Sequence, residues 1–133
     1  MIVFKYRKER GIFGVTFRPV ADVDIQKVNG TWVEFHPYID SGADITLIPY
    51  SFGLYLGLKV GEGKIEELKG VRGIAIPVEI RRVKMRIGNV ELEPRVAWAL
   101  IEEAPPLLGR LDIFDKFNIT FKEREGKIIF EPV

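Results

Sequence analysis

The sequence predicts an all-β domain with one or two short helices. Apolar and polar residues alternate with a period of two along most of the chain, as in strands that bury one face. Turn signals rich in Gly, Asn and Pro recur about every ten residues, the spacing of short antiparallel strands. The chain has 133 residues and shows no linker or internal repeat, so we expect one domain over residues 1–133.

Three turn signals lie between alternating runs, at Asn29-Gly30, Gly88-Asn89 and Gly126, and each is expected to close a hairpin. Asn29-Gly30 favours a type I′ turn, because both residues tolerate positive φ, and Gly88-Asn89 suits a type II′ turn. Over residues 76–87 the apolar positions change phase at Arg81-Arg82. This shift predicts a bulge or a bend in a long strand.

Two segments have helical character. Residues 49–57 begin with Pro and end with Gly, which suits a short helix, and Leu54 and Leu56 are expected to face inward. Residues 111–117 place three apolar side chains at helical spacing, and Asn118 is a candidate left-handed stop. The sequence therefore predicts two short helices among the strands.

Composition excludes several classes of function. A net charge of +1 gives no electrostatic reason to expect nucleic acid or an anionic membrane as a partner. There is no secretory signal and no apolar run of the ~18 residues that a membrane span needs, so a cytoplasmic location is expected. Cysteine is absent and His36 is the one histidine, which excludes a Cys/His zinc site, and we expect neither metal nor cofactor. Few Asn and Gln beside many Glu, Lys and Arg suit a thermophilic source.

Two short motifs carry the chemistry. Asp40-Ser41-Gly42 follows the apolar strand end Tyr38-Ile39, and Leu107-Leu108-Gly109-Arg110 comes about 65 residues later. A carboxylate on a sharp turn at the end of a strand suits acid–base hydrolysis, which requires one ionised and one protonated carboxyl group. The chain has one Asp-Ser-Gly, so two copies related by a two-fold axis would supply the pair. This reasoning predicts a homodimer.

The two motifs together resemble those of the retropepsin-like aspartic proteases, the homodimeric half-size relatives of pepsin. Asp40-Ser41-Gly42-Ala43 is similar to the family's Asp-Thr/Ser-Gly-Ala, and residues 46–49 and 56–58 are similar to the segments that follow it. Leu107-Leu108-Gly109-Arg110 is similar to the family's Leu-Leu/Ile-Gly-Arg, and the resemblance spans residues 20–121. It implies a single-lobe closed β-barrel of the acid-protease type and an aspartic endopeptidase that cuts an extended peptide or protein substrate.

The resemblance also implies roles for single residues. Asp40 of each subunit would hold the attacking water, and Ser41 and Gly42 would support the catalytic loop. Substrate contacts would come from Gly42, Ala43 and Asp44. Asp44 would also form a structural ion pair with Arg110. The segment Gly70-Val71-Arg72-Gly73 falls at the family's flap, a hairpin that closes over bound substrate.

Several alternatives stay open. The fold could be a catalytically inactive dimeric module that binds peptides or other proteins, or a protease restricted to one partner. The flap segment could be a simple surface turn, and Leu111 stands where many family members have Asp or Asn. The terminal residues 1–6 and 127–133 could interleave with those of a second subunit. The basic residues of 81–86 mostly alternate with apolar ones, which indicates a solvated strand face more than a nucleic-acid site.

Overall fold

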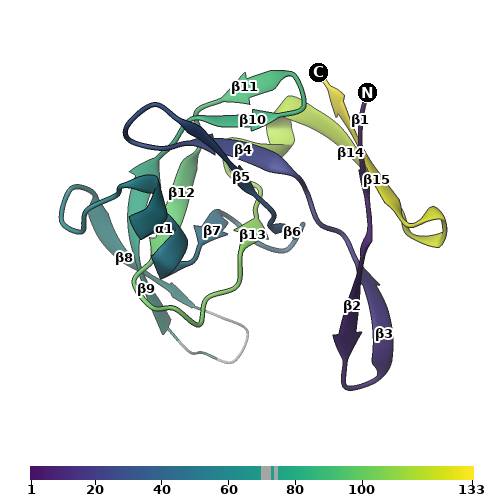
Figure 1. The fold of residues 1–133 in the computed structure, drawn as a ribbon, viewed down its shortest axis with the longest axis horizontal. Helices are drawn as coiled ribbons and strands as arrows, with labels where there is room; N and C mark the ends of the chain where they lie inside the picture. The colour runs from purple at the N-terminus through teal and green to yellow at the C-terminus, as the bar shows by residue number, and fades with distance from the viewer. Residues whose placement is uncertain (70–72, 74) are drawn as a thin grey trace.

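The computed structural model describes residues 1–69, 73 and 75–133, and these form a mostly-β protein (Figure 1). The first strands are β1 (Ile2–Lys5), β2 (Arg7–Gly11), β3 (Gly14–Arg18), β4 (Val23–Gln26), β5 (Trp32–Phe35), β6 (Tyr38–Ile39) and β7 (Thr46–Ile48). The others are β8 (Lys64–Lys69), β9 (Ala75–Arg82), β10 (Met85–Ile87), β11 (Val90–Leu92), β12 (Arg95–Ala99), β13 (Leu107–Leu108), β14 (Phe117–Lys122) and β15 (Lys127–Pro132). The helices are α1 (Tyr50–Leu56) and the single 3₁₀ turns η1 (Phe114–Lys116) and η2 (Glu123–Glu125).

The strands form four sheets. A six-stranded sheet has the order β6-β13-β7-β12-β9-β8, and a four-stranded sheet has the order β11-β10-β4-β5. The chain ends form a third sheet, β1-β15-β14, and β2 pairs with β3. The all-β prediction is confirmed. Within the described residues no sheet closes on itself, so the closed barrel is not confirmed and stays a prediction.

The terminal strands pair within the same chain. β1 runs antiparallel to β15, with Ile2 opposite Phe130 and Lys5 opposite Lys127. β14 pairs with the other side of β15, and the two are joined by the predicted C-terminal hairpin, in which Gly126 has φ +65°. The outer strands of this terminal sheet are therefore β1 and β14.

The other two predicted hairpins also form, but one has a different turn. Ile87 lies opposite Val90 and Gly88 has φ +58°, as a two-residue type II′ loop requires. β4 pairs with β5 as expected, yet of Asn29 and Gly30 only Gly30 has positive φ. Hydrogen bonds join Lys27 to Gly30 and to Thr31, so this is a three-residue loop with a bulge and not a type I′ turn.

The phase change in the long predicted strand is a transfer between sheets. β9 ends at Arg82 in the six-stranded sheet, and β10 starts at Met85 in the four-stranded one. The predicted bend is confirmed.

The first predicted helix is α1. Of the two residues predicted to face inward, only one does so. Leu56 is buried, but Leu54 is 49% exposed. Residues two apart lie about 200° apart around a helix, so Leu54 and Leu56 could not both face the core. The helix packs through Gly53, where an added Cβ would stand 2.0 Å from Nε1 of the buried Trp98.

The second predicted helix is mostly absent. Over residues 111–117 only η1 is helical, and Asn118, the expected stop, is paired with Glu131 in the β14–β15 ladder. Asp112 adopts φ +62°, a conformation that interrupts a right-handed helix. Its carboxylate accepts hydrogen bonds from Arg95 Nε at 2.8 Å, Arg95 Nη2 at 3.0 Å and the Arg95 backbone N–H at 3.0 Å.

The hydrogen bonds between Asp112 and Arg95 make the free energy of unfolding depend on pH. The hydrogen bonds from the Arg95 side chain and backbone lower the pKa of Asp112 well below its usual range. A carboxylate with a lowered folded-state pKa adds stability above its unfolded pKa of about 3.9 and loses it as the pH falls further. We expect Asp112→Asn to lower the free energy of unfolding at neutral pH and to differ less from the wild type in acid.

Urea unfolding at about pH 7 and about pH 3 checks this prediction. Asp115→Asn is the matched control, because Asp115 is exposed and bonds only to its neighbour Lys116 among the described residues. A gap between Asp112→Asn and the wild type that widens on acidification would contradict the prediction.

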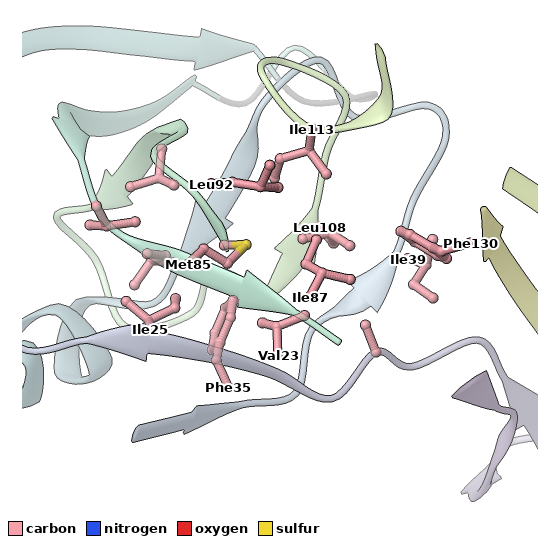
Figure 2. Packing of buried hydrophobic residues seen from close by; sticks show 14 of the residues in the cluster. Val23, Ile25, Phe35, Ile39, Met85, Ile87, Leu92, Leu108, Ile113 and Phe130 are labelled. Carbon is pink, nitrogen blue, oxygen red and sulfur yellow. The ribbon is translucent and has the colours of Figure 1, made fainter. Parts of the chain in front are cut away.

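The core joins the six-, four- and three-stranded sheets (Figure 2). Val23, Met85 and Ile87 enter it from the four-stranded sheet, and Phe130 enters it from the terminal sheet. Ile39 and Leu108 belong to the same cluster and come directly before Asp40 and Gly109 in the chain. The core thus holds the strand ends that carry both sequence motifs. Across the described ranges, none of the helices has the length and apolar character that crossing a lipid bilayer requires.

Candidate active site

The two motifs lie side by side on neighbouring strands. β6 and β13 run parallel, with Tyr38 opposite Leu107 and Ile39 opposite Leu108. The backbone N–H of Asp40 donates to the carbonyl of Leu108 at 3.1 Å and so extends the ladder by one bond. Two short apolar strands therefore end together, and Asp40 stands at their common end.

Asp40 begins a tight turn that orients its own carboxylate. Oδ1 accepts a hydrogen bond from the backbone N–H of Gly42 at 2.9 Å, and the backbone carbonyl accepts one from Ala43 at 3.1 Å. Asp40 and Ala43 are half-buried, and Ser41 and Gly42 are exposed. The turn therefore holds one carboxylate oxygen and leaves Ser41 and Gly42 exposed to solvent.

Gly109 connects the second motif to the segment that follows Asp40. Its backbone N–H donates to Oγ1 of the buried Thr46 at 3.0 Å. A Cβ at Gly109 would stand 2.3 Å from the carbonyl carbon of Ile45, so only glycine permits this approach. Thr46 lies in a segment that resembles the family, but the sequence analysis assigned it no role. A hydroxyl inside the apolar strand Thr46-Leu47-Ile48 could have indicated a buried hydrogen bond at this position.

Thr46→Val is expected to lower the free energy of unfolding by about 1–3 kcal/mol, because it leaves the buried N–H of Gly109 without an acceptor. Thr46→Ser is the matched control, since it keeps the hydroxyl and should cost less. Thermal unfolding of both variants checks the prediction. Equal losses for Val and Ser would show that packing, and not this hydrogen bond, is what Thr46 supplies.

The predicted ion pair between Asp44 and Arg110 does not form. Among the ion pairs of the described residues, none joins these two side chains. Their backbones do meet, because Arg110 N–H donates to the Ala43 carbonyl at 2.9 Å and Leu111 N–H donates to the Asp44 carbonyl at 2.9 Å. The exposed Arg110 guanidinium instead donates to the Ser41 carbonyl at 3.4 Å, so it supports the turn after Asp40 from the side.

An open depression of about 550 Å³ lies beside Asp40. Tyr38 and Leu107 line it, together with Glu9 and Arg18 from β2 and β3. The Tyr38 hydroxyl donates to Glu9 Oε1 at 2.5 Å, which raises the pKa of Tyr38, and Arg18 Nε pairs with Glu9 Oε2 at 3.1 Å. The sequence reasoning missed Glu9 and Arg18, because nothing local in the chain shows that β2 and β3 reach this site.

The predicted flap is only partly described. Gly70, Val71 and Arg72 lie outside the described residues, and Gly73 is exposed with φ +72°. On either side of this segment β8 and β9 pair antiparallel, with Lys69 opposite Ala75. These two paired strands precede and follow the predicted flap segment in the chain.

The comparisons with known proteins concern the fold. No protein-family model matches the chain, and no curated protein matches its sequence. Among solved structures, it is similar to a retropepsin-like aspartic protease from Rickettsia conorii, with a TM-score of 0.68, 17% identity, and coverage of 96% of this chain and 97% of that one. It is also similar to EIAV protease complexed with the inhibitor HBY-793, with a TM-score of 0.54, 22% identity, and coverage of 70% and 82%. The chain has the retropepsin-like fold of these aspartic proteases.

Proposed function

We propose that this protein is an aspartic endopeptidase that works as a homodimer and hydrolyses peptide bonds with a water held between two Asp40 carboxylates. One observation carries the proposal. In a retropepsin-like fold, β6 pairs with β13 and its end presents Asp40 on an open turn, where the Asp40 carboxylate accepts a hydrogen bond from the Gly42 N–H. This is a carboxylate held in place for acid–base chemistry.

The chemistry requires two such carboxylates in different protonation states. At about 4 Å, two negative charges repel by roughly 4 kcal/mol at an effective dielectric constant near 20, or about three pKa units. The pair therefore shares one proton over a wide pH range. The ionised carboxylate takes a proton from water, and the protonated one donates to the substrate carbonyl.

The second carboxylate would be Asp40 of another copy. A two-fold axis brings each residue near its own image, so one Asp-Ser-Gly turn per chain becomes a pair. Ser41 and Gly42 are exposed at the tip of the turn, where the opposite turn would meet them. In this arrangement Ser41 supports the contact between the two loops.

An extended peptide would bind beside this pair as an added strand. Gly42, Ala43 and Asp44 would contact its backbone, and the depression beside Asp40 would take a side chain. The predicted flap segment Gly70-Val71-Arg72-Gly73, which follows β8 in the chain, would close over the peptide and exclude water. No cofactor enters the reaction.

Mass spectrometry of a complex peptide mixture tests the proposal. The protein and Asp40→Asn are incubated with the mixture from about pH 4 to 7, because a shared-proton pair predicts a bell-shaped profile on the acidic side. Internal cuts made by the wild type alone are the expected result, and they also reveal the side-chain preference. No cuts from a preparation shown to be dimeric would favour the inactive peptide-binding module instead.

A further inference from the structure

Strands β2 and β3 form a hairpin that projects from the rest of the molecule. Within the described residues these two strands pair only with each other, and Figure 1 shows the hairpin directed away from the body. Its tip is Ile12-Phe13, between the paired residues Gly11 and Gly14. Ile12 and Phe13 are 93% and 90% exposed, more than any other large apolar side chain among the described residues. Two such side chains together at an apex mark an interaction surface.

Contacts at the root determine which face of the hairpin turns outward. Glu9 Oε1 accepts a hydrogen bond from the Tyr38 hydroxyl at 2.5 Å, and Arg7 pairs with Asp22. Glu9 lies opposite Thr16, and both residues are half-buried. The face that carries Glu9 and Thr16 therefore turns toward the body, and the opposite face, the outer face, turns away from it.

The outer face combines basic and apolar side chains. Lys8 lies opposite Phe17, and Arg10 lies opposite Val15. All four side chains are exposed. Neither Lys8 nor Arg10 forms an ion pair with another residue in the described ranges. This face therefore presents two positive charges that no described carboxylate neutralises, beside two apolar side chains.

Charge is divided unevenly along the chain. Of the 20 basic and 19 acidic residues, residues 1–18 hold five and one. This segment therefore has a charge of +4 and the remainder a charge of −3, although the net charge is only +1. The net charge alone gave no reason to expect an anionic membrane as a partner. Its division does, because an anionic surface attracts the end of the molecule that carries the hairpin and so orients the approach.

The spacing of these residues matches the depth of a lipid headgroup layer. At about 3.3 Å per residue, Arg10 lies about 7 Å and Lys8 about 13 Å behind Ile12 along the strand. Interfacial segments bury their apolar side chains about 5–10 Å into the boundary between headgroups and acyl chains. With the tip at that depth, Arg10 lies among the lipid phosphates. Lys8 lies close outside them, within a Debye length of about 8 Å.

Other anionic partners fit these residues less well. Single-stranded nucleic acid would attract the basic side chains, but it binds by stacking its bases on aromatic rings. Ile12 and Val15 offer no ring. A protein partner would need an apolar pocket shaped to a projecting tip, whereas a fluid bilayer accepts such a tip without a preformed pocket.

We infer that the β2–β3 hairpin docks this protein on an anionic membrane surface. Ile12 and Phe13 enter the boundary between headgroups and acyl chains, and Lys8 and Arg10 pair with the anionic headgroups. The inference goes beyond the proposed function and does not depend on it, because these four residues lie outside the candidate active site. Docking would also bring the depression beside Asp40 near the membrane, since Glu9 at the hairpin root lines it.

Sedimentation with lipid vesicles tests the docking. We expect the wild type to bind phosphatidylcholine vesicles with about 30% phosphatidylserine at least ten-fold more tightly than pure phosphatidylcholine vesicles, because each basic residue near an anionic surface contributes about five-fold. Binding should weaken as salt is added, since salt screens these charges. Equal binding to the two kinds of vesicle would overturn the docking.

Two double variants separate the contribution of the tip from that of the charges. Ile12→Ser/Phe13→Ser is expected to lower the partition coefficient on anionic vesicles about ten-fold or more, because it removes the apolar area that enters the lipid. Val60→Ser/Ile65→Ser is its matched control, since both residues are exposed outside the hairpin, and it should bind as the wild type does. Equal binding of the tip variant and this control would overturn the docking.

Lys8→Gln/Arg10→Gln is expected to lose most of the preference for anionic vesicles. Its matched control is Lys59→Gln/Lys84→Gln, which removes the same charge from two exposed residues outside the hairpin and should keep the preference. If both variants lose it equally, overall charge and not the hairpin causes the binding, and the docking is overturned.

A fluorophore on a single cysteine determines what covers the tip, because the chain has no cysteine of its own. Phe13→Cys, labelled with an environment-sensitive fluorophore, should shift its emission to the blue when anionic vesicles are added. Lipids with a nitroxide on the acyl chain should quench it. Labelled Val60→Cys, which is also exposed, should show neither effect. A blue shift that needs no vesicles and grows with protein concentration would mean that a second copy covers the tip, and would overturn the docking.

Discussion

Asp40→Asn is expected to lower the rate of peptide cleavage by about 10⁴-fold or more, because it removes both the acid and the base of the proposed reaction. An amide cannot take up or share the proton that passes between two carboxylates. The loss should appear in kcat, since Asn keeps the shape of the side chain and therefore the binding of substrate. Cleavage of a peptide found by mass spectrometry, followed over time, measures the effect.

The fold and the dimer are expected to survive this change. The Asp40 carboxylate makes one side-chain hydrogen bond within the described residues, to the N–H of Gly42 at 2.9 Å, and the Asn oxygen can accept the same bond. Glu103→Gln is the matched control, because it neutralises an exposed carboxylate outside the site and should keep its activity. Asp40→Asn protein that cleaves as fast as this control would exclude the proposed mechanism.

Gly109→Ala is expected to lower the free energy of unfolding by about 3 kcal/mol or more, which corresponds to a fall in melting temperature of about 10 °C. The added methyl group would stand 2.3 Å from the Ile45 carbonyl carbon and 2.8 Å from the Thr46 nitrogen, both backbone atoms. Backbone cannot move aside as a flexible side chain can, so β7 and β13 must separate. The hydrogen bond from the Gly109 N–H to the Thr46 hydroxyl would be lost when these strands separate.

Gly11→Ala provides the comparison for this variant. The nearest atom to a Cβ at Gly11 is the Gly14 carbonyl oxygen at 3.9 Å, an ordinary contact. We expect its melting temperature to stay close to that of the wild type. Equal melting temperatures for Gly109→Ala and Gly11→Ala would contradict the prediction, because they would mean that the backbone of Ile45 and Thr46 does not pack closely on Gly109.

Local patterns predicted those parts of the fold that depend on neighbouring residues. Alternation and turn chemistry located the hairpins at Gly88-Asn89 and Gly126, because a short turn brings its two flanking strands together. The Asn29-Gly30 hairpin was also correct, although its turn type was not, since a three-residue loop fits the same residues. The helical pattern after Gly109 failed because Arg95, from another strand, binds Asp112 and holds it in a non-helical conformation.

In the candidate active site, too, the sequence predicted the local features and the tertiary structure decided the long-range contacts. The sequence by itself determined that Asp40-Ser41-Gly42 ends an apolar strand on a turn, since neighbouring residues decide this. That Leu107-Leu108 is a strand paired with Tyr38-Ile39 was decided by the tertiary structure. Only the tertiary structure decided that Arg110 supports Ser41 and not Asp44, that Thr46 accepts from Gly109, and that Glu9 reaches Tyr38. These contacts join residues 29 to 69 positions apart along the chain. Side chains so far apart meet only once the sheets have packed, and the direction in which each one points depends on that packing.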